Sequence, residues 1–163
     1  MAKVADSNGI TVAPLRNLPI IKDLAVDMTG FFDKWARAQG RFVPGPGAAT
    51  DFAVVPPDSR ERRAADAAIE CIGCGVCHAA CDVVSWNPDY LGPAALNRAW
   101  TLVNDVRDGA RDERLAAVAG DAGCHACHTQ QNCRAFCPKH LDPTASIAGL
   151  KRATVLAALK GKI

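Results

Sequence analysis

The stretch CHACHTQQNCRAFCP, Cys124 to Pro138, decides the fold that we expect for this chain. Counted back from Cys137 and Pro138, the spacing C-x2-C-x2-C-x3-C-P needs a cysteine at position 130, where the chain has Gln130. This spacing is the ligand run of bacterial-type iron–sulfur clusters. The glutamine at a ligand position and the additional cysteine, Cys124, therefore both need an explanation.

The composition excludes several other classes of protein. The chain has 163 residues with a net charge of +2, from 19 basic and 17 acidic side chains, and shows no basic run, so we expect no nucleic-acid partner. No apolar run is long enough to span a bilayer. All 8 cysteines lie between Cys71 and Cys137, and residues 1–11 lack a secretory signal pattern. Clustered cysteines without such a signal favour metal or redox chemistry over disulfides.

The first third of the chain predicts one helix between irregular segments. We expect an extended leader at residues 1–19. Apolar residues then recur at helical spacing from Ile20 through Leu24, Met28 and Phe32, with Ile21, Phe31 and Trp35 widening the stripe, and the helix should end near Gly40. A proline-rich linker follows. We place a domain boundary at its end, with residues 1–57 as a partner-docking leader, helix and linker, and residues 58–163 as the main domain.

The remainder of the chain also predicts helices. Asp58, with Glu61 three residues later, is the expected N-cap of a helix toward Glu70. A second helix should follow Pro93, with Leu96, Trp100 and Val103 on one face, and a third should span Arg111 to Val118. Asp142 and Pro143 predict the start of a last helix that runs to Lys160 before Gly161. No strand or hairpin pattern stands out, so the expected fold class is all-α.

The two cysteine runs specify two clusters in a crossed arrangement. The first run is complete, because Cys71, Cys74, Cys77 and Cys81 follow the spacing C-x2-C-x2-C-x3-C. In two-cluster ferredoxins the fourth cysteine of each run binds the other cluster. The first cluster then takes Cys71, Cys74, Cys77 and Cys137, which suits a [4Fe–4S] centre. The second takes Cys81, Cys127 and Cys133.

Gln130 occupies the position of the missing fourth ligand of the second cluster. An amide is a poor ligand for a soft iron site, so three thiolates predict a [3Fe–4S] centre. Cys124 is either a packing cysteine or a replacement fourth ligand. One structural zinc site is a weaker alternative, because it would leave four cysteines without a role.

The residues around these runs resemble a known family. The stretches CIGCGVCHAAC, WNPDYLGPAALNRAW and CHTQQNCRAFCPKHLDPTASIAGLK are similar to the C-terminal half of the iron–sulfur subunit of succinate dehydrogenase and fumarate reductase, respiratory complex II. The stretch PLRNLPIIKDLAVDMTGFFDKW resembles the segment that follows the first domain of that subunit. The fold that this resemblance implies is a helical dicluster ferredoxin domain.

The resemblance also implies a function and a set of partners. It implies an electron-transfer subunit of a succinate:quinone oxidoreductase, with Trp86 and His128 at a quinone site beside the [3Fe–4S] cluster. The implied partners are a flavoprotein subunit with FAD, a [2Fe–2S] domain, and membrane anchor subunits that can carry haem b. The implied location is peripheral, on the matrix side of the mitochondrial inner membrane or the cytoplasmic side of a bacterial membrane.

The chain departs from the family in several places. No cysteine precedes Cys71, so we expect the [2Fe–2S] cluster on a separate ferredoxin-like chain, with a fragment of a longer subunit as the alternative. Asp82 stands where the family usually has proline. The stretches PKH and LGPAAL resemble the fumarate reductase branch, whereas Trp86 and His128 resemble the succinate dehydrogenase branch, so the direction of catalysis stays open. A dicluster module of a soluble thiol or disulfide reductase is the alternative function, and Gln130 and Trp86 count against it.

Overall fold

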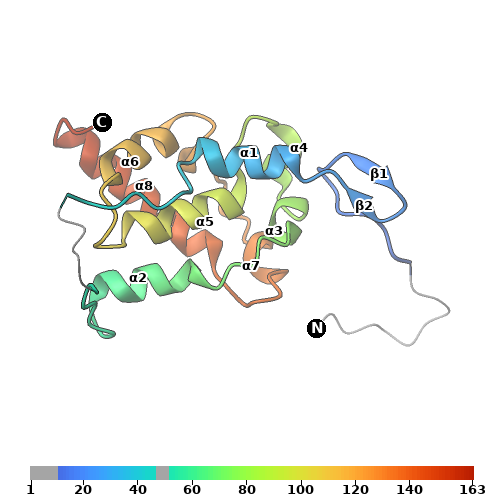
Figure 1. Cartoon of the computed structure of the whole chain (residues 1–163). Coiled ribbons are helices and arrows are strands. Elements are labelled where there is room, and N and C mark those ends of the chain that lie inside the picture. Colours follow the sequence, from blue (N-terminus) through green and yellow to red (C-terminus); the bar gives the residue numbers. More distant parts are fainter. Residues whose placement is uncertain (1–10, 47–51) are drawn as a thin grey trace.

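Helix α5, Gly92–Val103, lies at the centre of the fold (Figure 1). The computed structural model describes residues 11–46 and 52–163. The longer helices that pack against α5 are α1 (Thr29–Arg37), α2 (Arg60–Ile69), α6 (Arg111–Ala119) and α8 (Pro143–Leu159). Leu96 and Ala99 of α5 are fully buried. The predicted helical fold is confirmed, and the apolar face of α5 forms its core.

The contact between α5 and α8 depends on a glycine. A Cβ atom at Gly149 would lie 2.4 Å from the ring of Trp100, which no real packing allows. The missing side chain lets the two helices approach closely enough to bury Ile147 and Leu150 against α5. This helix pair is the support for both cysteine runs, because one run lies before α5 and the other before α8.

The predicted ends of α8 are confirmed. The Asp142 side chain accepts a hydrogen bond from the backbone N–H of Ala145 at 2.9 Å, and Pro143 begins the helix. Gly161 follows the C-cap with a φ angle of 64°, a left-handed conformation that glycine adopts without strain. The helices predicted after Pro93 and from Arg111 also form, the second one residue longer than expected.

The prediction of a single helix from Ile20 to Gly40 is wrong in its first part. Residues Ile20–Lys22 (β1) and Ala25–Val26 (β2) instead pair as an antiparallel hairpin, the element that the sequence reading missed. Asp23 turns the chain with a φ angle of 50°, a conformation that aspartate tolerates better than most residues. Asp27 closes the hairpin by donating its N–H to the carbonyl of Pro19 at 2.8 Å.

The apolar residues of this segment consequently divide between two environments. Phe31 is buried in the fold, and Trp35 packs against the core from α1. Ile20 and Leu24, which belong to the hairpin, are 63% and 55% exposed. The expected continuous helical stripe therefore does not exist, because strand geometry points the hairpin residues away from the face of α1 that packs on α5.

The predicted cap of α2 is wrong by one residue. Ser59 is the N-cap, and its hydroxyl accepts a hydrogen bond from the N–H of Arg62 at 3.1 Å, while Glu61 lies in the first turn. Asp58 precedes the cap and does not cap the helix. Serine and aspartate are comparable N-cap residues, so the sequence alone does not show which of the neighbours Asp58 and Ser59 caps the helix.

A buried ion pair holds the segment after α1 onto α6. Arg114 and Asp108 lie 2.6 Å apart with fully buried side chains. Arg114 also donates to the carbonyls of Gln39 and Arg41. The boundary predicted between residues 57 and 58 stays a prediction, although the residues of α1 share the core. The leader at residues 1–10 and linker residues 47–51 lie outside the described part.

The cysteine runs form short elements at one end of the molecule. They are α3 (Val76–Ala79), α4 (Asp82–Trp86), the 3-10 helix η1 (Cys124–Ala126) and α7 (Asn132–Ala135). Figure 1 shows α3, α4 and α7 on the side of the hairpin, away from the C-terminus. None of the helices within residues 11–46 and 52–163 has the length and apolar character needed to cross a bilayer.

Candidate iron–sulfur centres

The two cysteine runs adopt the same backbone conformation. In the first run, Gly73 and Gly75 have φ angles of 65° and 75° on either side of Cys74. In the second run, Thr129 and Gln131 have φ angles of 61° and 65° on either side of Gln130. Each loop therefore places two left-handed residues around its second ligand position. The sequence repeat is also a structural repeat.

The same helical turn follows each loop. The N–H of Ala79 bonds to the carbonyl of Gly75 at 2.9 Å, and the N–H of Ala135 bonds to that of Gln131 at 3.0 Å. Each short helix carries the third cysteine, which is Cys77 in α3 and Cys133 in α7. The third cysteine of each run therefore belongs to a helical turn and not to the loop before it.

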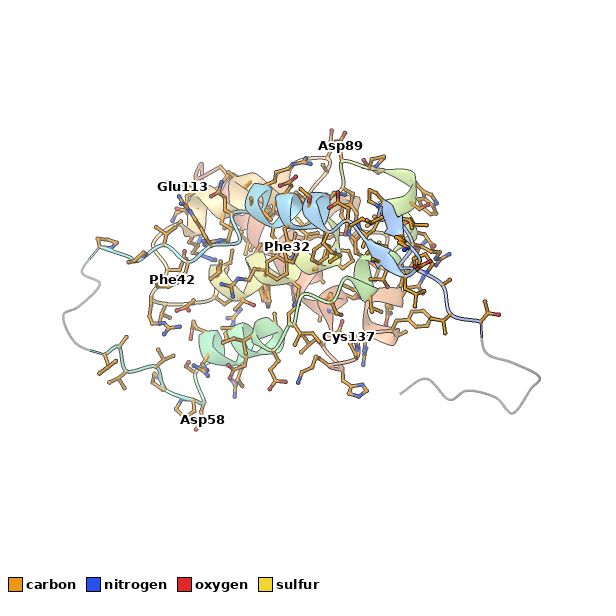
Figure 2. All side chains as sticks on the ribbon, turned by 45° about the vertical axis from the view of Figure 1, so that its right-hand side comes forward. Phe32, Phe42, Asp58, Asp89, Glu113 and Cys137 are labelled. Carbon is orange, nitrogen blue, oxygen red and sulfur yellow. The ribbon has the colours of Figure 1, made fainter. Side chains whose placement is uncertain are left out.

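The first group of cysteines surrounds one pocket. Cys71, Cys74 and Cys77 line it together with Cys137 from the second run, which Figure 2 labels. Ala94 and Asn97 of α5 close its inner wall. Asn97 is 1% exposed, and its side-chain oxygen has no hydrogen-bond partner among the described residues. A buried polar atom left without a partner is expected where a further group completes the site.

The second pocket is lined by the three cysteines that the sequence predicts as ligands of the second cluster. Cys81 from the first run lies there with Cys127 and Cys133 from the second. Gln130 lies on the exposed rim of the same pocket. The structure thus brings together four cysteines in one place and three cysteines with the glutamine in another.

Cys124 lies outside both groups. It is fully buried in the hydrophobic core, where its sulfur lies 3.8 Å from the hydroxyl oxygen of Thr154 on α8. Gly123 before it makes a tight turn, because a Cβ there would lie 2.0 Å from the carbonyl oxygen of Val118. This environment favours the packing cysteine among the two roles predicted for Cys124.

The thiols in both pockets are held in surroundings that oppose ionisation. Burial raises the pKa of Cys77, and the neighbouring Cys71 and Cys133 thiolates raise it further. Burial likewise raises the pKa of Cys133, which Cys127 and Cys81 reinforce. Crowded thiolates become favourable when a cationic group neutralises them. Because α3, which carries Cys77, packs against α7, which carries Cys133, the two pockets also adjoin each other.

The donor set fits iron–sulfur clusters. No three His, Cys, Asp or Glu side chains of residues 11–46 and 52–163 converge on one point that could hold a single metal ion. In a cluster each thiolate binds a different iron atom, so its ligands lie further apart than those of one ion. All-thiolate pockets are the usual environment for such clusters, which the residues present can hold.

Trp86 and His128 contact each other on the surface beside the second pocket. Their ring centroids lie 6.0 Å apart in an edge-to-face arrangement. His128 lines the mouth of the pocket, and Trp86, at the end of α4, is 64% exposed. The two residues come from different runs, so their contact depends on how the runs pack together. The two side chains together form one wall beside the mouth of the second pocket, and the Trp86 part of this wall is exposed.

Sequence reasoning missed two residues that line these pockets and one buried histidine near them. Tyr90 and Thr144 line the second pocket, and nothing in their sequence context marks them as part of it.

His78 is 3% exposed and packs edge-to-face on Phe31, and burial lowers its pKa to about 4. A Cβ at Gly92 would lie 3.1 Å from the Nδ1 atom of His78, so this histidine needs a glycine beside it.

Comparisons with known proteins agree with this arrangement. Residues 70–142 match the family described as the 4Fe-4S dicluster domain. One relative is the mitochondrial succinate dehydrogenase [ubiquinone] iron-sulfur subunit 1 of Oryza sativa subsp. japonica. It is 35% identical over 147 residues, which are 90% of this chain and 52% of that protein. The succinate dehydrogenase iron-sulfur subunit of Paracoccus denitrificans is also 35% identical, over 150 residues, 90% of this chain and 56% of that protein.

A solved structure gives the same relationship. A chain of the Mycobacterium smegmatis Sdh1 complex in the apo form superposes with a TM-score of 0.69 at 26% identity, covering 91% of this chain and 61% of that one. The chain spans about half the length of the curated relatives that it matches. By sequence and by fold, the chain is therefore similar to about half of the length of succinate dehydrogenase iron–sulfur subunits, and its residues 70–142 match the 4Fe-4S dicluster domain family.

Proposed function

We propose that this chain is an electron-transfer subunit of a succinate:quinone oxidoreductase. In this proposal a [4Fe–4S] cluster is held by Cys71, Cys74, Cys77 and Cys137, and a [3Fe–4S] cluster by Cys81, Cys127 and Cys133. The observation that carries the proposal is the crossed grouping of these cysteines around two adjoining pockets. The likeness to succinate dehydrogenase subunits supports the choice of enzyme.

The type of the second cluster is argued from Gln130. This residue stands at the same place in its loop as Cys74, because both lie between two left-handed residues. Its amide withholds a thiolate, and the buried Cys124 beside Thr154 lines neither pocket. Three thiolates suit a [3Fe–4S] centre.

The clusters would supply one-electron redox chemistry, and the chain would supply burial, ligands and hydrogen bonds. The pockets adjoin, because α3 with Cys77 packs against α7 with Cys133. Adjoining pockets suit electron passage from one centre to the next. Electrons from the flavin would reach this chain through a [2Fe–2S] cluster on a partner.

The proposed exit is a quinone site with Trp86 and His128 in its wall. The indole N–H is a donor only, and a quinone carbonyl gains negative charge on reduction. The exposure of Trp86 leaves the rest of the pocket to membrane anchor subunits, which can carry haem b. The proposal places the protein peripherally at a membrane, on the matrix or bacterial cytoplasmic side.

The proposed partners on the other side are the flavoprotein with FAD and a ferredoxin-like chain with the [2Fe–2S] cluster. The hairpin offers them an apolar surface, since Ile20, Ile21 and Leu24 are all more than half exposed. This surface replaces the helical stripe expected from the sequence, because Phe31 and Trp35 pack inward.

The test is to purify the complex through this chain and identify its components. We expect a flavoprotein, a [2Fe–2S] chain and membrane anchors to copurify, with an EPR signal of an oxidised [3Fe–4S] cluster and succinate-dependent quinone reduction. Measuring fumarate reduction with the same preparation establishes the preferred direction. A soluble protein with two [4Fe–4S] clusters and disulfide-reductase activity would reject the proposal in favour of the alternative class.

A further inference from the structure

Two residues with side-chain hydroxyls line the second pocket beside its sulfur atoms. The hydroxyl oxygen of Thr144 lies 3.3 Å from the sulfur of Cys133. The phenol of Tyr90, the only tyrosine of the chain, lines the same pocket as Cys127. Both residues line the pocket that holds Cys81, Cys127 and Cys133.

The positions of these hydroxyls are well determined by the fold. Tyr90 is 1% exposed and belongs to the core cluster just before α5. Thr144 follows Pro143 in the first turn of α8, whose start is held by the cap at Asp142. Tyr90 cannot turn toward solvent without opening the core, and the helix start fixes the backbone of the half-buried Thr144.

The direction of a hydrogen bond to these sulfur atoms follows from the chemistry of the ligands. A thiolate bound to iron has no proton, so it only accepts, and the hydroxyls must donate. The hydroxyls can therefore act on these sulfur atoms only as donors.

The first pocket offers no comparable pair. Its lining contains no Ser, Thr or Tyr, and its polar side chains are Asn97 and Lys139. A hydrogen bond to a ligand sulfur stabilises the more negatively charged, reduced form of a cluster. The hydroxyls thus act on one of the two centres only.

We infer that Tyr90 and Thr144 raise the reduction potential of the centre held by Cys81, Cys127 and Cys133, and so favour electron passage to it from the adjoining centre. This inference rests on the proposed function, because it needs that ligand set to hold a cluster. Both residues act through the ligands Cys127 and Cys133 and are positioning residues, not ligands.

The test is an EPR-monitored redox titration of the purified complex with Tyr90→Phe, Thr144→Val and the double variant. At a fixed solution potential, each single variant should lower the ratio of reduced to oxidised second cluster by roughly tenfold, which is about 59 mV for a one-electron couple. The double variant should shift further than either single variant. The midpoint potential of the first cluster, measured in the same sample, should not move.

Two matched variants separate the hydroxyls from general effects of substitution. Thr144→Ser keeps the donor and should restore the unmutated midpoint potential. Thr154→Val removes another buried hydroxyl of α8, one that contacts Cys124, which is not a proposed ligand. It should leave both midpoint potentials unchanged.

The outcomes distinguish this inference from the proposed function. If the unmutated complex shows no cluster signals, the proposed function fails. If both clusters are present and the midpoint potential of the second stays unchanged in the double variant, the inference is overturned while the proposed function stands. Equal shifts of both clusters would also overturn it, because they would indicate a general change in packing.

Discussion

Gln130 occupies in the second cysteine loop the place that Cys74 occupies in the first. The residues on either side of Cys74 have φ angles of 65° and 75°, and those on either side of Gln130 have 61° and 65°. The two loops continue into helical turns with the same hydrogen bonds. One side chain therefore distinguishes two otherwise equivalent ligand loops, and this equivalence leads to the first prediction.

Gln130→Cys should convert the second centre to a [4Fe–4S] cluster. The loop already has the conformation that presents Cys74, so a cysteine there needs no rearrangement of the backbone. An oxidised [3Fe–4S] cluster is paramagnetic and an oxidised [4Fe–4S] cluster is not, so the oxidised-state EPR signal should disappear and quinone reduction should slow. Cys124→Ser serves as the control and should leave the signal intact. A [3Fe–4S] signal that appears only in Cys124→Ser would instead identify Cys124 as a ligand.

Thr129→Gly should stabilise the protein by about 1 kcal/mol or less. A β-branched residue is strained at a φ angle of 61°, and relief of that strain exceeds the extra chain entropy that glycine loses on folding. Gly73→Ala at the matching position should destabilise by about 1 kcal/mol, because nothing crowds its Cβ closer than 3.9 Å and only the backbone conformation opposes it. Chemical unfolding of the cluster-loaded protein measures both. Changes of the same sign would show that the two loops are not equivalent.

Trp86→Phe should slow succinate–quinone reduction by about two to three powers of ten. The substitution keeps an aromatic ring against His128 and deletes the indole N–H, so it isolates the hydrogen bond from packing. Succinate oxidation by an artificial acceptor that takes electrons from the flavin should stay nearly unchanged.

Phe42→Leu is the matched control for Trp86→Phe. Phe42 is also an exposed aromatic residue, and Figure 2 shows it at the other end of the molecule from Cys137. This variant should leave both assays unchanged. Loss of both activities in Trp86→Phe, or loss of neither, would place the quinone away from Trp86.

Arg114→Met should destabilise the fold by about 3–5 kcal/mol. It leaves the buried carboxylate of Asp108 without its partner, and the carbonyls of Gln39 and Arg41 lose a donor. Arg107→Met breaks an exposed ion pair with Asp105 and should cost about 1 kcal/mol or less. Denaturant unfolding of the two variants side by side tests the difference. Equal losses would show that the buried pair does not hold the segment after α1.

Ile21→Lys should weaken docking of the ferredoxin-like partner. Ile21 is 70% exposed on the hairpin, so a lysine there leaves the fold of this chain intact and puts a charge into an apolar interface. The partner should be depleted from the purified complex, while the EPR signals of this chain persist. Leu159→Lys, 79% exposed at the end of α8, is the control and should retain the partner. Recovery of a longer form of this chain with its own [2Fe–2S] domain would reject a separate partner chain.

The cysteine spacing and the helix signals were readable from the sequence alone. The start of α8 at Asp142 and Pro143 and its stop at Gly161 depend on neighbours within one turn, so local patterns predict them. The spacing of the two runs also predicted the crossed grouping of the cysteines, because in two-cluster ferredoxins the fourth cysteine of each run binds the other cluster. The identity of residue 130 was equally visible without coordinates.

Only the tertiary structure decided the features that depend on distant parts of the chain. The segment from Ile20 to Leu24 has helical spacing, yet it forms a hairpin because Asp23 allows a tight turn, and no pattern in the segment shows this. Tyr90 and Thr144 become partners of the second pocket because α5 and α8 pack closely at Gly149. Packing between helices far apart in sequence sets such contacts, and a one-dimensional pattern carries no information about their distances.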